Sequence, residues 1–116
     1  MQEADRLSPG TEAEMIRELS VHVVLYQEES WYVAHCLEFD LVAQGYDPLE
    51  AFKNLLDAIE LQAEYALEMG DWGLLFNPAP AEYWRMLVEA ERYTPEPNGW
   101  ELPAFVSRVD CSLLMR

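Results

Sequence analysis

The feature that most constrains the fold is a junction at residues 45–50, where a β-type run stops and an amphipathic helix is predicted to begin. Gly45 closes the run, and the pair Asp47-Pro48 follows it. The Asp47 carboxylate can accept hydrogen bonds from the free N–H groups of a first helical turn. Pro48 suits the first helical position because its missing N–H would be unpaired there. Glu50 completes an acidic form of the capping box, so the helix is predicted to begin at residue 48.

The predicted helix covers residues 48–69 and has one apolar side. Its apolar positions recur at helical spacing and are Phe52, Leu55, Leu56, Ile59, Ala63, Ala66 and Leu67. The opposite side carries Lys53, Asp57, Glu60, Glu64 and Glu68. A helix of this kind needs a surface to cover, and the β-type runs that precede it are predicted to supply that surface.

Three such runs, rich in β-branched and aromatic residues, occupy residues 19–27, 31–37 and 41–46. The first two are separated by a short polar break and are predicted to pair as an antiparallel hairpin. A second helix over residues 81–92 and a further strand over residues 104–114 follow the long helix. The predicted fold class is therefore α/β (α+β): an antiparallel sheet of three to four strands with one long helix packed on a face.

The domain organisation follows from length and local composition. Residues 1–17 carry Ser8, Pro9 and Gly10 among several charges and are predicted to be a flexible N-terminal arm, with a short helical turn near residues 12–18. Residues 18–116 are predicted to form a single α/β domain, because a chain of 116 residues can bury a sizeable core.

The net charge of −15 restricts the classes of partner. Direct binding of nucleic acid is not expected, since neutralising phosphates requires clustered Lys and Arg. A strongly acidic protein is either simply well solvated or attracts a basic protein partner. Cys36 and Cys111 are far apart in sequence and predict a reduced, cytoplasmic chain, and no apolar run approaches the length of about 20 residues that a membrane span needs.

The segment CLEFDLVAQGYDPLEAFKNLLDAI, which follows the predicted hairpin, resembles the HicB-like antitoxin family over about residues 20–69. The matching residues are Cys36, Leu37, Glu38, Asp40, Val42, Gln44, Gly45, Glu50, Ala51, Asn54 and Leu55. The resemblance implies a truncated ribonuclease H-like fold without a catalytic carboxylate set. It also implies a non-enzymatic, protein-binding role, in which the domain masks a small basic RNA-cleaving toxin. The alternative is a stand-alone, self-associating structural or regulatory domain that has no toxin.

Six residues are predicted to contact a partner, and no catalytic, cofactor or metal residue is assigned. Carboxylates around the strand–helix junction and on the helix can meet a basic protein, and exposed aromatic residues near Pro and Gly turns are common at interfaces. The six residues are Glu38, Asp40, Glu60, Glu64, Trp72 and Trp84. Four further aromatic residues of the C-terminal half, Phe76, Tyr83, Tyr93 and Trp100, are assigned either to the core or to an interface.

His22, His35 and Cys36 leave three interpretations open. One hairpin register would place His22 opposite Cys36 and permit cysteine catalysis, and another would place it opposite His35 and suggest a metal. Packing across the strands is the third interpretation, and it is favoured because two histidines without a third ligand are a weak metal signal. Open sheet edges also predict a homodimer or a higher homo-oligomer, without indicating which strand lies at the edge.

Overall fold

The computed structural model of the chain describes residues 19–95, 101–103 and 105–115, so the predictions for residues 1–17 and for Trp100 lie outside the described residues. In chain order the elements are β1 (Leu19–Glu28), β2 (Trp31–Cys36), β3 (Leu41–Gly45), α2 (Pro48–Met69), the 3₁₀ helix η1 (Trp72–Leu74), α3 (Ala81–Glu89), β4 (Glu91–Arg92) and β5 (Val106–Leu113). No helix in this part of the chain has the length and apolar character needed to cross a membrane.

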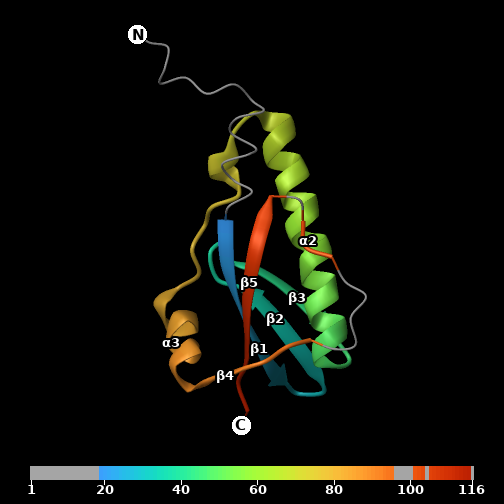
Figure 1. Cartoon of the computed structure of the whole chain (residues 1–116), viewed down its shortest axis with the longest axis vertical. Coiled ribbons are helices and arrows are strands. Elements are labelled where there is room, and N and C mark those ends of the chain that lie inside the picture. Colours follow the sequence, from blue (N-terminus) through green and yellow to red (C-terminus); the bar gives the residue numbers. More distant parts are fainter. Residues whose placement is uncertain (1–18, 96–100, 104, 116) are drawn as a thin grey trace.

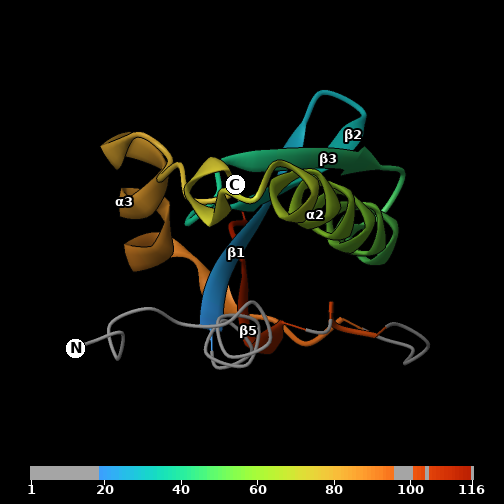
Figure 2. The same cartoon turned by 90° about the horizontal axis from the view of Figure 1, so that it is seen from above.

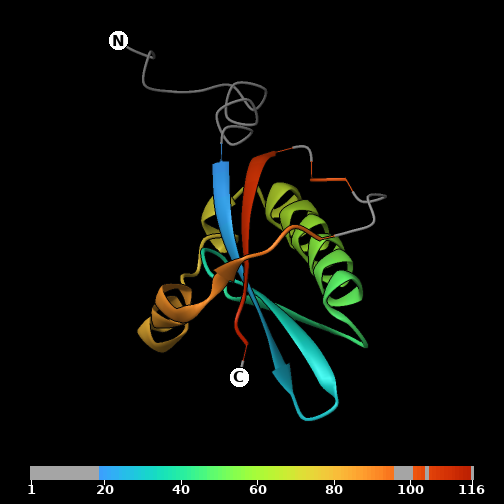
Figure 3. The same ribbon diagram turned by 60° about the horizontal axis from the view of Figure 1, so that its bottom comes forward.

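The strands form one five-stranded sheet in the order β3-β2-β1-β5-β4. β1, β2 and β3 are an antiparallel meander, whereas β5 runs parallel to β1 and lies directly beside it (Figures 1 and 3). The α+β class, the long helix and the C-terminal strand are confirmed. The sheet is mixed rather than antiparallel, because the connection from α2 to β5 returns the chain to the end of the sheet where β1 begins.

The hairpin between β1 and β2 has a shorter turn than the sequence suggested. Glu28 pairs with Trp31, so only Glu29 and Ser30 form the turn, and Glu29 has a left-handed backbone (φ 57°). The turn length sets the register, which pairs Val23 with Cys36 and places His22 beside Leu37. Both registers considered for His22 are therefore wrong: neither Cys36 nor His35 lies directly opposite it.

The junction that opens α2 has the predicted caps. The Asp47 carboxylate accepts a hydrogen bond from the Glu50 N–H at 2.8 Å, and the Glu50 carboxylate accepts one from the Tyr46 N–H at 2.5 Å. Pro48 is the first helical residue, and the left-handed Gly70 ends the helix. The predicted apolar side is confirmed except at Leu67, which is 59% exposed. Ala66, which was also predicted to lie on the apolar side, is fully buried.

The two helices cover opposite faces of the sheet (Figure 2). The main core lies between the sheet and α2 and includes Val21, Val23, Leu25, Ala34, Cys36, Phe52, Leu55, Ile59 and Cys111. On the other face Val24, Leu37 and Ala79 form a smaller cluster, against which α3 packs Tyr83, Trp84, Met86 and Leu87. α3 ends at Glu89, earlier than predicted, because Glu91–Arg92 pair with β5 as β4.

Candidate functional site

The α3 face of the sheet carries the polar groups that most resemble a functional site. β1 and β2 place His22 and His35 on this face, and the bend after β2 places Glu38 and Asp40 close to them. The connection to α3 is held against the same bend, since the Ala79 N–H donates to the Leu37 carbonyl at 2.8 Å and the Asn77 N–H donates to the Glu38 carbonyl at 3.1 Å. The strands, the bend and α3 therefore meet at one place.

His22 is held between carboxylates at the middle of the sheet. Its Nδ1 lies 2.6 Å from Oε2 of Glu38, and its backbone N–H donates to Oε1 of the same carboxylate at 2.8 Å. Its Nε2 faces Oδ2 of Asp110, on β5, at 3.8 Å. The Trp84 ring lies 6.0 Å from the imidazole, and its indole N–H donates to the Ala79 carbonyl at 3.1 Å. These contacts fix the bend and α3 onto β1.

His35 forms a second, deeper pair with a carboxylate. Its Nε2 lies 2.7 Å from Oδ1 of Asp40, while its Nδ1 is buried without a hydrogen-bond partner in the described structure. The side chain is only 3% exposed, and the Tyr83 ring covers it at a centroid distance of 4.5 Å. Asp40 has a left-handed backbone (φ 54°), a conformation that Asp tolerates better than most residues. This geometry supports a structural role in seating α3.

Removing the acceptor of His35 should measure that role. Asp40→Ala leaves the buried Nε2 unpaired and puts alanine in a left-handed conformation, so we expect the free energy of unfolding to fall by about 2–3 kcal/mol. Asp40→Asn keeps both an acceptor oxygen and a residue suited to this backbone, and should cost less than about 1 kcal/mol. Urea unfolding of both variants checks this. An Asp40→Ala protein within about 0.5 kcal/mol of wild type would contradict it.

The cysteine interpretations have no geometric support. Cys36 lies on the α2 face of β2, in the main core, while His22 and His35 lie on the α3 face. Burial raises the pKa of the Cys36 thiol to about 12, so it remains a poor nucleophile at neutral pH. No group of three or more His, Cys, Asp or Glu among the described residues is arranged to hold a metal ion. Cross-strand packing is the interpretation that these contacts favour.

The six residues predicted to contact a partner fall into three places. Glu38, Asp40 and Trp84 lie on the α3 face, where each makes the internal contacts described above. Glu60 and Glu64 are exposed on the outer side of α2. Trp72 lies in η1 and packs against the main core, with its ring 6.2 Å from Phe105. No single surface therefore brings all six together.

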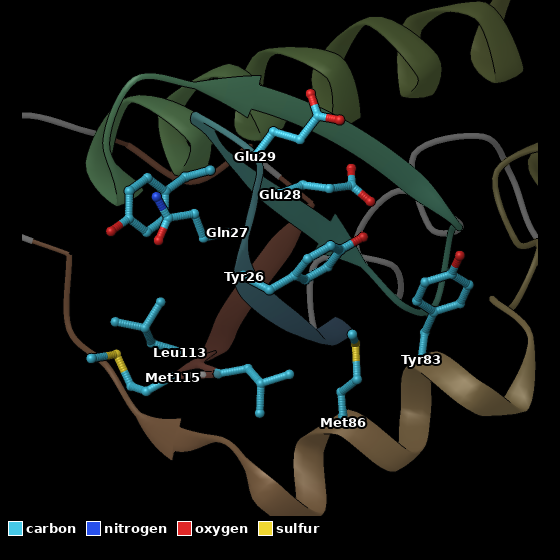
Figure 4. Close-up of a pocket in the computed structure, with 10 residues that line it drawn as sticks. Tyr26, Gln27, Glu28, Glu29, Tyr83, Met86, Leu113 and Met115 are labelled. Atoms are coloured by element: carbon cyan, nitrogen blue, oxygen red, sulfur yellow. The ribbon is translucent and has the colours of Figure 1, made fainter.

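A hollow of about 480 Å³ lies where the ends of β1 and β5 meet the hairpin turn and α3. Figure 4 shows Tyr26 in the middle of its lining, with Glu28 and Glu29 above, Met86 below and Tyr83 to one side. Sequence reasoning missed this site. Tyr83 and Met86 share a helical spacing that could have indicated a common face, but nothing local indicates that the end of β5 completes the wall.

Comparison with known proteins adds no relative: no protein-family model matches the sequence, and neither a curated protein nor a solved structure matches it. The function must therefore be inferred from the fold, the charge and the geometry of the described residues.

Proposed function

We propose that this chain is a non-enzymatic protein-binding domain of the HicB antitoxin type, which neutralises a small basic RNA-cleaving toxin by covering it. The observation that carries the proposal is the net charge of −15 on a chain of 116 residues with an ordinary hydrophobic core. Such a field accelerates the encounter with a basic protein and repels nucleic acid. The toxin's own RNA-binding surface, which must be basic, is the complementary target.

The fold supports this proposal. β1, β2 and β3 form an antiparallel meander, α2 follows them, and β5 lies parallel to β1. This arrangement is compatible with the truncated ribonuclease H-like fold that the resemblance to HicB-like antitoxins implies. The outer side of α2 presents Asp57, Glu60, Glu64 and Glu68 to solvent, with Lys53 as the basic residue of that side. The two unpaired cysteines are compatible with the cytoplasmic setting that the proposal includes.

We expect a small basic protein to be encoded next to this chain, and the test is co-expression of the two. We expect the basic protein alone to arrest growth and the pair to restore it, with the two proteins purifying as one complex. A chain carrying Gly45→Val, which should not fold, is the control for expression without a folded domain. Absence of both a complex and growth rescue would exclude the antitoxin function.

A specific observation favours self-association as a second candidate function. β3 lies at one edge of the sheet and has five residues, whereas β4 at the other edge has two. At the β3 edge Val42 is exposed, and the rings of Trp31 and Tyr46 stack with their centroids 4.9 Å apart. Unpaired strand edges with apolar neighbours are templates for pairing with a second chain. A dimer mass in light scattering of the purified protein alone would support this candidate, and a monomer at all concentrations would exclude it.

A further inference from the structure

The hollow at the end of the sheet has a lining suited to one kind of ligand. Its volume of about 480 Å³ lies within the usual range for ligand sites in proteins. Tyr26 and Tyr83 supply aromatic rings, Met86 and Met115 supply thioethers, and Glu28 and Glu29 supply carboxylates. None of its lining residues, all of which the structure describes, is Lys, Arg or His. Aromatic faces combined with carboxylates favour an organic cation over an anion or a neutral apolar molecule.

The charges around the hollow also favour a cation. The pKa of Tyr26 is raised to about 12, first because the phenol is half-buried and then because Tyr83, Glu28 and Asp40 would repel its phenolate. Burial disfavours a charge of either sign, but the repulsion from the Glu28 and Asp40 carboxylates becomes an attraction for a cation placed in the same space. The chain's overall charge of −15 acts in the same direction.

Glu29 belongs to the lining because of the hairpin turn. A two-residue turn requires a positive φ at its first central residue, and Glu29 has a φ of 57°. The turn holds this carboxylate at the rim of the hollow, next to that of Glu28. Two carboxylates therefore lie at the end of the hollow where the hairpin closes.

We infer that this hollow receives the guanidinium group of an arginine side chain from a basic protein partner. A guanidinium can stack on the Tyr26 and Tyr83 rings while it donates to the Glu28 and Glu29 carboxylates, a combination for which its planar shape is suited. The inference names the anchoring site within the proposed function and rests on it for the identity of the partner. Whether the hollow binds a guanidinium group can, however, be tested without that partner.

The experiment titrates hexa-arginine amide into the full chain at low salt and measures affinity by calorimetry. Glu28→Gln/Glu29→Gln is compared with Glu82→Gln/Glu101→Gln, a matched control that removes the same charge from exposed positions outside the lining of the hollow. We expect the first pair to weaken binding about tenfold or more, as loss of charge-assisted hydrogen bonds from an aromatic site should, and the second to weaken it less than about threefold. Tyr83→Leu, which keeps the charge, should weaken binding about fivefold through the lost cation–π contact.

Four results would overturn the inference. Equal losses in the two double variants would mean that the peptide follows net charge alone, and absence of binding would mean that the hollow holds no guanidinium. If agmatine bound as tightly as hexa-arginine, the site would belong to a small cation rather than to a protein. A basic partner that formed its complex equally well with both double variants would overturn this inference and leave the proposed function standing.

Discussion

Replacing Gly45 with alanine is expected to lower the free energy of unfolding by about 2–4 kcal/mol and the melting temperature by about 10–20 °C. A Cβ at this position would lie 2.8 Å from the carbonyl carbon of Glu50 and 2.9 Å from Cα of Ala51, and closer still to the Ala51 nitrogen. All three atoms belong to the backbone of the first turn of α2. They cannot rotate aside as a side chain would, so the helix must move away from β3.

Gly70→Ala is the control for this prediction. Gly70 has a φ of 68°, and no atom lies within 4 Å of the place that a Cβ would occupy, so its alanine variant suffers backbone strain without a clash. It should cost only about 1 kcal/mol. Thermal and urea unfolding of both variants measures the difference. If Gly45→Ala cost no more than Gly70→Ala, the close approach of α2 to β3 would not be a constraint on the fold.

Raising the pH from 9 to 11 is expected to remove about 4 kcal/mol of stability, chiefly through the two buried thiols. Burial is the main cause that raises the pKa of both Cys36 and Cys111 from 9.0 to about 12. The unfolded chain therefore releases these protons near pH 9, while the folded chain keeps them. The stabilisation is complete below pH 9 and is lost as the pH rises towards 12. Tyr26, with its raised pKa, adds a smaller effect of the same sign.

The variant Cys36→Ala/Cys111→Ala separates the thiols from other groups that titrate in this range. It should be less stable at pH 8, because each substitution leaves a small cavity, but should lose far less stability between pH 9 and 11. Urea unfolding with a reducing agent, at each pH, gives both curves. Parallel losses in the two proteins would assign the alkaline instability to other residues.

The long helix was predictable to the residue because its boundary signals are local. The Asp47 carboxylate accepts from the Glu50 N–H of the first turn, and Pro48 has no N–H to leave unpaired. Gly70 supplies the left-handed conformation that ends the helix. The alternation along β1 places Val21, Val23 and Leu25 in the main core, whereas His22, Val24 and Tyr26 lie on the face that α3 covers.

The candidate sites were less predictable, because they depend on register and on strand order. The carboxylates of Glu38 and Asp40 were visible in the sequence, but their pairing with His22 and His35 required the true length of the hairpin turn. The hollow around Tyr26 could not be predicted without knowing that α3 forms one side of it and the parallel strand β5 the other. Both walls come from residues more than 50 positions along the chain from Tyr26.

By itself, the sequence of this protein determined the α+β class, the main secondary-structure elements and the side that α2 would bury. These properties arise from capping and from side-chain periodicity within a few residues. Only the tertiary structure decided the parallel placement of β5 beside β1, the seating of α3 on the far face, and the acidic, aromatic hollow that they enclose. Those features depend on contacts between distant segments, which become favourable only once the whole sheet has formed and its two faces are available for packing.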